Sequence, residues 1–233
     1  MLRVAVVIPV YNDAEFLRSC LRALADQSVA PTEVIVVDNA STDDSAEVAR
    51  SFGARVIFEG RRGILSATAA GCDAARADII ARLDADSLPP QDWIEQVVGT
   101  FVARPGISAV TGLGDYYEAS RFTTQVVGPL YLGFYRTAMG ALLGQPPLYG
   151  SNMAMRSSVW RRVSPQVHRS IRAVHDDLDI SYHFLPTEFI VYDPTLRVGL
   201  SARPIQSWWA FARRAWWAVV TIGINEIERL FRS

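Results

Sequence analysis

Ile79–Leu88 reads IIARLDADSL, and this stretch predicts a buried strand that ends in an acidic loop. Asp84 and Asp86 stand two residues apart, directly after the apolar run. Carboxylates at this spacing can share a hard divalent cation, and such a cation can hold a diphosphate. The motif alone is weak, because about one Asp-x-Asp is expected by chance in a chain this rich in aspartate. Its meaning therefore depends on what surrounds it.

The residues before Ile79 alternate between strand and helix patterns. Apolar runs predict strands over Val4–Val10, Val34–Val37, Ala54–Phe58 and Ile79–Leu83, and helices are expected after Asn12 or Asp13, after Ser41 and over Gly63–Arg76. This rhythm predicts an α/β fold with a doubly wound, mostly parallel sheet. Sheets of this kind bind ligands at the carboxyl ends of their strands. The loops after the first, second and fourth strands should therefore meet at one crevice.

The second half of the chain is less regular. A helix over Gln91–Ala103 and a strand over Ile107–Thr111 continue the rhythm, but Tyr116–Gly150 is aromatic and glycine-rich and resembles an insertion over the site. We expect three parts: residues 1–115, residues 116–204, and an amphipathic helical tail over 205–233. No dinucleotide or Walker glycine motif follows the first strand, which disfavours dinucleotide-binding and ordinary ATPase functions.

Composition narrows the class of protein. The chain has 233 residues, half of them apolar, and a net charge of −1, which suits one large domain and indicates no nucleic-acid partner. Cys20 and Cys72 are isolated and are expected to be small core residues. The amino terminus lacks a signal-peptide pattern, and no window is apolar enough to span a bilayer. We expect a cytoplasmic location, with peripheral contact at the inner face of the plasma membrane.

Three motifs occur in a characteristic order. They are VIPVYN at 7–12, VVDNASTD at 36–43 and the Asp84-Ala85-Asp86 triplet. Together they resemble the inverting family 2 glycosyltransferases of the GT-A fold, over roughly Val4–Ser181. GSNMAMR at 150–156 and DDLDIS at 176–181 are similar to the acceptor-side and catalytic-base segments of that family.

The resemblance implies a nucleotide-sugar donor and a Mg²⁺ or Mn²⁺ cofactor. It makes residues 1–115 the nucleotide-sugar-binding half and residues 116–204 the acceptor-binding and catalytic half. Pro9, Tyr11 and Asp13 would line the nucleotide pocket, with the Tyr11 ring against the base, and Asp38 would bond the base or ribose. Arg62 would meet phosphate, although a solvated arginine is an equal alternative. Asp84 would lie near ribose and metal, Asp86 would bind the metal directly, and the small Ala85 would let the backbone approach the ligand. His175 and His183 are the candidates for a third metal ligand, against an ordinary structural role.

The resemblance also assigns the catalytic side. Asp177 matches the general base, while Asp176, Gly150, Ser151 and Asn152 match the acceptor-binding positions. Asp176 stands where the family carries glutamate, so its side chain is one methylene shorter. A packed group of carboxylates should raise the pKa of at least one of them. The alternative is a solvated helix start, where aspartates favour the helix dipole.

Past Ser181 the resemblance weakens. The Gln-x-x-Arg-Trp segment of processive synthases is replaced by Gln206-Ser207-Trp208-Trp209, which favours transfer of a single sugar. Tryptophans interleave with Arg213 and Arg214 in the tail, as in helices that lie on membranes, with core packing as an equal alternative. The predicted function is a metal-dependent inverting glycosyltransferase that uses a UDP- or GDP-sugar and a glycan, cell-envelope or lipid-linked acceptor. The alternatives are a sugar-nucleotide nucleotidyltransferase and an inactive binding protein of the same fold.

Overall fold

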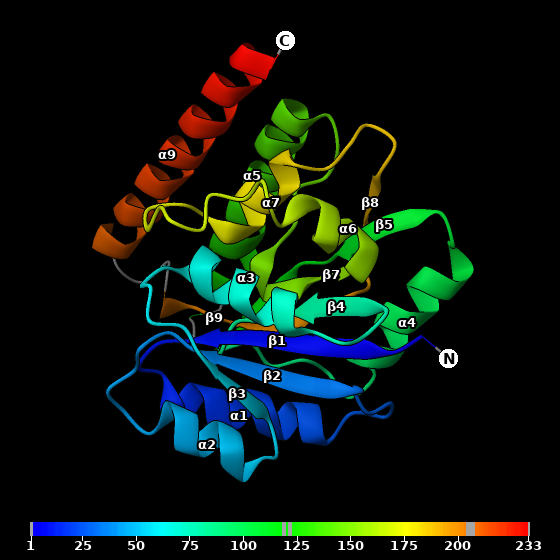
Figure 1. Cartoon of the computed structure of the whole chain (residues 1–233), viewed down its shortest axis with the longest axis vertical. Helices are drawn as coiled ribbons and strands as arrows, with labels where there is room; N and C mark the ends of the chain where they lie inside the picture. The colour runs from blue at the N-terminus through cyan, green and yellow to red at the C-terminus, as the bar shows by residue number, and fades with distance from the viewer. Residues whose placement is uncertain (1, 118–119, 121–122, 204–207, 233) are drawn as a thin grey trace.

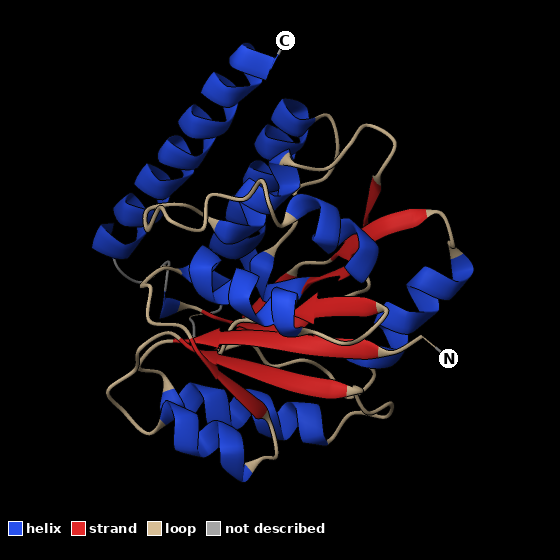
Figure 2. Ribbon diagram, in the orientation of Figure 1, coloured by secondary structure: helices blue, strands red, loops and turns tan. Residues whose placement is uncertain are grey.

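The computed structural model describes residues 2–117, 120, 123–203 and 208–232. Its main sheet has the strand order β3-β2-β1-β4-β7-β5-β8, and Figure 2 shows it running through the middle of the molecule. The strands are β1 Val4–Val10, β2 Glu33–Asp38, β3 Arg55–Phe58, β4 Ile79–Arg82, β5 Ile107–Thr111, β7 Met153–Arg156 and β8 Phe189–Tyr192. All neighbouring pairs are parallel except those of β7, which runs antiparallel to both β4 and β5. The expected mostly parallel sheet is confirmed. A small second sheet pairs β6 Gly114–Tyr117 with β9 Val198–Ser201.

Helices cover both faces of this sheet (Figure 1). They are α1 Ala14–Ala25, α2 Ser45–Ser51, α3 Ile64–Ala74, α4 Trp93–Ala103, α5 Gly128–Leu143, α6 Ser157–Val163, α7 Asp176–Tyr182 and α9 Trp208–Arg232. Alternate residues of β1 point to opposite faces, as the period of two in a strand requires. Val6 and Ile8 join the core under α1 and α4, whereas Val7 joins the core under α3 and α6. The continuous apolar run of β1 therefore reflects burial on both sides.

The structure adds detail that the pattern did not contain. The irregular stretch before Gly150 holds β6, a π-helical turn at Thr123–Val127 and the whole of α5. Neither Asn12 nor Asp13 caps α1 with its side chain; the Asp43 carboxylate accepts the Ala14 N–H instead, at 3.0 Å. Cys20 and Cys72 are free and buried, as expected. Among the described residues, no helix has the length and apolarity that crossing a membrane would need. Gln206 and Ser207 lie outside the described residues.

A buried ionic network attaches α9 to α7. The imidazole of His168 lies between two carboxylates, with Nδ1 2.7 Å from Asp179 of α7 and Nε2 2.8 Å from Glu228 of α9. Asn225 of α9 donates a further hydrogen bond to Asp179, at 2.9 Å. The hydrogen bond to Asp179, and then that to Glu228, outweigh burial and raise the pKa of His168 to about 9. The protonated imidazole therefore holds the last helix against the helix that follows His175.

Stability should fall as pH rises because of this network. The pKa of His168 lies above the unfolded value of 6.5, so its contribution is complete below about pH 6.5 and is lost as the pH passes about 9. The shift corresponds to about 3 kcal/mol. We expect the free energy of unfolding, measured by urea titration, to decrease over this range in the wild type. The free energy of unfolding of His168→Gln should be lower than that of the wild type at pH 6.5 and should change less as the pH rises. An equal dependence on pH in both proteins would contradict the assignment.

Candidate active site

A cavity of about 380 Å³ opens beside the carboxyl end of β4. Its lining brings together residues that are far apart in the sequence: Asp84, Asp86, Gly150, Ser151, Asp176 and Asp177. The first pair follows β4, the second pair precedes β7, and the last pair opens α7. Acidic groups from the predicted donor side and the predicted acceptor side therefore face one space.

Arg82, which sequence reasoning passed over as a strand residue, organises the floor of the cavity. Its side chain is 1% exposed, and Nη1 lies 2.6 Å from Asp84 while Nη2 lies 2.9 Å from Asp176. Thr68 of α3 donates a second hydrogen bond to Asp176, at 2.7 Å. A Cβ on Gly150 would come within 2.5 Å of Arg82 Nη1, so this position needs glycine. A buried charge is stable only when it is paired. Here the pairing of Arg82 with Asp176 connects β4 to α7, and the Thr68 hydroxyl connects α3 to the same carboxylate.

The pKa values of Asp84 and Asp86, the two carboxylates after β4, are shifted in opposite directions. Burial would raise the pKa of Asp84, but Arg82 and the Ser151 hydroxyl hold it below its ordinary value. Burial and the neighbouring Asp84 raise the pKa of Asp86, and the guanidinium of Arg203 only partly offsets them. Asp86 therefore carries a negative charge that its surroundings do not fully balance.

Arg203 links the loop after β1 to the loop after β4. Its guanidinium lies 2.7 Å from Asp86 and 2.6 Å from Asp13. Two carboxylates that converge on one cation are hard oxygen ligands of the kind that Mg²⁺ and Mn²⁺ take. The oxygens of Asp13 and Asp86 therefore fit a divalent cation. That Asp86 and Asp84 would be its protein ligands stays a prediction, since Asp84 contacts Arg82 and Ser151. Nothing in the sequence marked Arg203, since it lies 117 residues from Asp86.

The two histidines considered as a third metal ligand have other contacts. His183 lies on the α7 side of the molecule, 3.9 Å from Asp179, and lines a second cavity. His175 lines the catalytic cavity, but its Nε2 lies 2.9 Å from the backbone carbonyl of Arg214. His183 lies beside Asp179, which is bound to His168 and does not line the first cavity. This position argues against His183 as a ligand of a metal held by Asp86.

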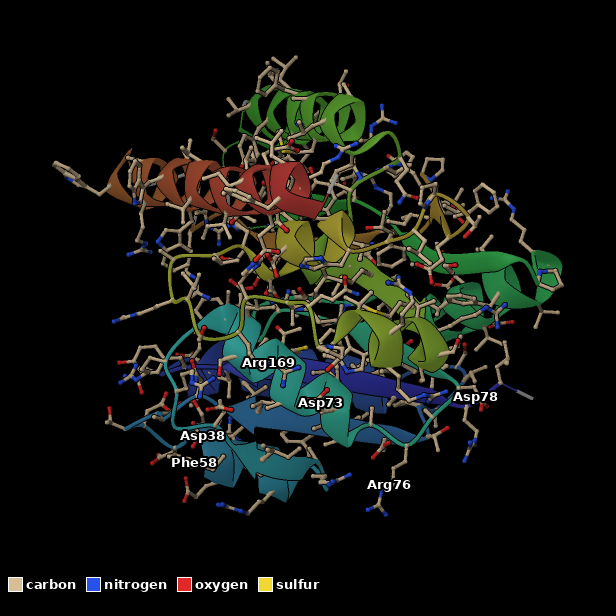
Figure 3. All side chains as sticks on the ribbon, turned by 45° about the horizontal axis from the view of Figure 1, so that its top comes forward. Asp38, Phe58, Asp73, Arg76, Asp78 and Arg169 are labelled. Atoms are coloured by element: carbon tan, nitrogen blue, oxygen red, sulfur yellow. The ribbon has the colours of Figure 1, made fainter. Side chains whose placement is uncertain are left out.

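The predicted nucleotide side lies at the ends of β1 and β2. Tyr11 is 47% exposed, and the guanidinium of Arg62 lies 3.7 Å from the centre of its ring. Asp38 is largely buried and accepts the Ser41 N–H at 2.9 Å; Figure 3 shows it near Phe58, its partner on β3. Pro9 precedes this loop within β1. The structure thus brings Tyr11 and Arg62 together, and an arginine beside an aromatic ring suits a base linked to phosphates.

Asn39, which the sequence did not single out, positions Arg62. Its amide nitrogen donates to the carbonyls of Glu59 and Arg61, and its amide oxygen accepts the Gly63 N–H. These three bonds fix the loop between β3 and α3. Ala85 is buried between the two acidic residues, where a larger side chain would compete for the same space.

Asp177 has the properties expected of a general base. Burial and the adjacent Asp176 raise the pKa of its carboxyl group. The Gly150 N–H donates to Asp177 Oδ2 at 2.9 Å, which orients the carboxylate. A raised pKa improves proton capture near neutral pH. The other oxygen, Oδ1, accepts the Leu178 N–H at 2.8 Å, so both oxygens are oriented by the backbone.

The acceptor-side residues divide into two groups. Gly150 and Ser151 line the cavity, and the Ser151 hydroxyl bonds to Asp84 at 2.6 Å. The assignment of Asn152 to acceptor binding is wrong: its side chain is buried, accepts from Trp93 and donates to the carbonyls of Leu113 and Leu196. Its hydrogen-bonding groups are all engaged inside the protein. Asp176 is 3% exposed and tied to Arg82, so its main role is to hold the floor.

The walls of the cavity are apolar and aromatic. They come from α5 and α9, and include Tyr131, Tyr135, Met139, Trp217 and Ala218. Burial raises the pKa of Tyr135 well above its ordinary value, so its hydroxyl stays protonated. The aromatic composition of residues 116–150 was the only sequence signal for this wall.

Several known proteins resemble this chain in sequence or in fold. The chain is 37% identical to the glycosyltransferase AglE of Haloferax volcanii over 117 residues, which are 47% of this chain and 38% of AglE. A mannosyltransferase of Pyrobaculum calidifontis, solved with GDP-Man and Mn²⁺, superposes with a TM-score of 0.64 at 22% identity and covers 85% of this chain and 56% of that one. Glucosyl-3-phosphoglycerate synthase of Mycobacterium tuberculosis, solved with Mn²⁺, UDP and glucosyl-3-phosphoglycerate, gives a TM-score of 0.66 at 21% identity, over 96% of this chain and 80% of that one.

Both structures have the GT-A fold, and their likeness to this chain establishes the fold alone. The chain spans just over a third of AglE. Residues 5–163 match the family described as Glycosyl transferase family 2. Since these residues make up more than half of the sequence, the chain belongs to the family 2 glycosyltransferases.

Proposed function

We propose that this glycosyltransferase moves one sugar, with inversion, from a UDP- or GDP-sugar to a glycan, cell-envelope or lipid-linked acceptor. The observation that carries the proposal is the shared cavity, in which Asp84 and Asp86 face the same space as Asp177. The solved neighbours that contain Mn²⁺ with GDP-mannose or UDP are consistent with this donor chemistry.

The residues before position 116 would hold the donor. Tyr11 and Asp38 would contact the nucleoside, with Pro9 shaping the loop, and Arg62 the phosphates. Asp86 and Asp84 would hold Mg²⁺ or Mn²⁺, which supplies positive charge to the departing diphosphate. Asp13 and Arg203 would adjust this charge, because Arg203 pairs with Asp13 and Asp86.

The reacting groups would come from residues 116–204. Asp177 would take the proton of an acceptor hydroxyl as its oxygen attacks the anomeric carbon. The bond from that carbon to the diphosphate oxygen breaks, and the nucleoside diphosphate leaves with the bonding electrons. Attack from the face opposite the leaving group inverts the configuration. Gly150 and Ser151 would shape the acceptor side, and a peripheral position at the inner face of the plasma membrane would suit a lipid-linked acceptor.

Thermal unfolding with nucleotide and metal tests the donor assignment. UDP or GDP with Mn²⁺ should raise the melting temperature more than the nucleotide alone or Mn²⁺ alone. At a ligand concentration about 100 times the Kd, the stabilisation should be about 2.7 kcal/mol. ADP with Mn²⁺ is the comparison for base preference. A protein that shows no metal-dependent shift with either nucleotide would contradict the proposal.

A further inference from the structure

Helix α9 is apolar on two opposite faces. Val220 and Ile224 pack against the core beneath α3 and α6, and Thr221 and Asn225 are buried on the same side. The outward face carries large apolar side chains that are 57–88% exposed: Trp209, Trp216, Val219, Ile227, Leu230 and Phe231. Figure 1 shows α9 along one edge of the molecule. An exposed apolar face on a helix whose other side is already packed indicates a second covering surface.

The apolar surface continues onto α5. Leu130 and Phe134 of this helix are largely exposed, and Val126 and Val127 precede them. Phe134 also lines the catalytic cavity, opposite Trp217 and Ala218 of α9. The mouth of the cavity is therefore bounded by the same two helices that carry the exposed apolar side chains.

The charge of this region is positive. Residues 208–225 of α9 contain Arg213 and Arg214 and no acidic residue. Both arginines are exposed, and Arg214 also lines the cavity that holds Asp84 and Asp177. Tryptophan and arginine interleaved on an apolar helix are typical of segments that lie in the interface of an anionic bilayer. A neutral partner protein would gain nothing from these arginines.

We propose that the outward faces of α5 and α9 dock on an anionic lipid bilayer, and that the cavity between them takes an acceptor carried by that bilayer. The acceptor class is an amphiphile with an anionic phosphate head near Arg214, an apolar chain between Phe134 and Trp217, and its reacting hydroxyl at Asp177. The inference rests on the proposed function and narrows its acceptor to the lipid-linked class. Membrane and acceptor share one opening, so the acceptor reaches Asp177 without leaving the lipid.

Vesicle flotation tests the docking surface. The wild type should associate with vesicles of phosphatidylcholine and phosphatidylglycerol more strongly than with phosphatidylcholine alone. Val219→Asp should weaken association by roughly tenfold or more, since it places a charge on the exposed apolar face that would enter the bilayer. The matched control is Val102→Asp on α4, because Val102 is 62% exposed and Val219 is 59% exposed. Equal flotation of the two variants would overturn the proposal.

A second copy of the chain is the competing occupant. Sedimentation velocity should give a monomer for the wild type in detergent-free buffer. A dimer that Val219→Asp dissociates and Val102→Asp leaves intact would assign the surface to self-association and overturn the proposal. Leu230→Asp provides a second variant on the same face if Val219→Asp fails to fold.

Dodecyl phosphate is the probe for the acceptor half of the cavity. In the presence of Mn²⁺ and nucleotide, it should raise the melting temperature, whereas inorganic phosphate should not. Phe134→Ser should weaken its binding by roughly tenfold, while Phe189→Ser, at an exposed phenylalanine on β8, should not. If the nucleotide and Mn²⁺ shift remains but neither vesicles nor dodecyl phosphate bind, this inference fails and the proposed function stands. Loss of the nucleotide shift itself would refute the proposed function.

Discussion

Asp177→Asn should lower kcat by about 10²–10⁴-fold while UDP or GDP binding with Mn²⁺ stays unchanged. The substitution removes the proton acceptor but keeps one oxygen, which can accept either the Gly150 or the Leu178 N–H. Circular dichroism checks that the variant is folded. Donor binding should persist because the groups proposed to hold the nucleotide and metal lie on other segments. Turnover is measured with a saturating donor sugar, and donor affinity by titration calorimetry.

The pH profile distinguishes a base from a structural carboxylate. Burial and Asp176 raise the pKa of Asp177, so activity should fall as pH decreases at a higher pH than an ordinary aspartate would give. This acid limb should vanish from the residual activity of Asp177→Asn. Asp92→Asn, at an exposed aspartate that begins α4, is the matched control and should retain both rate and profile. If Asp177→Asn turns over normally, Asp177 is not the general base.

The donor half of the fold could be predicted because its signals are local. Each of β1, β2 and β4 is a short apolar run followed at once by polar residues, and parallel strands place such loops at one edge of a sheet. Asp84 and Asp86 therefore arrived at the cavity as expected. The position of β7 was not predictable in this way. It enters between β4 and β5 in the opposite direction, and that pairing depends on contacts between distant residues.

The residues that sequence reasoning missed act through distant partners. The role of Arg82 depends on its ion pair with Asp176, and the role of Arg203 depends on its ion pairs with Asp13 and Asp86. These partners are far from the arginines in the sequence. Asn152 shows the opposite error: its place in a family-like motif indicated the acceptor, whereas its hydrogen bonds to Trp93 and two carbonyls show a structural amide. A motif predicts where a residue lies more reliably than where its side chain points.

Asp86→Ala should abolish the metal-dependent part of nucleotide binding. In the wild type, Arg203 pairs with Asp86, so a divalent cation would share this carboxylate with a guanidinium. Without Asp86, Asp84 alone would remain to hold the cation, and Asp84 is already engaged by Arg82 and Ser151. The stabilisation by nucleotide with Mn²⁺ should therefore fall by about 2–3 kcal/mol, to the value for nucleotide alone.

The ion pair between Arg203 and Asp13 should keep the loop in place in this variant, so folding is not expected to fail. Asp115→Ala is the matched control, because Asp115 is also an aspartate paired with an arginine, at 2.5 Å from Arg197, and it stands on β6. That variant should keep the full Mn²⁺ effect. The other carboxylate on this loop, Asp84, is paired with the buried Arg82. Unaltered Mn²⁺-dependent affinity for UDP and GDP in Asp86→Ala would therefore show that the cation is held elsewhere.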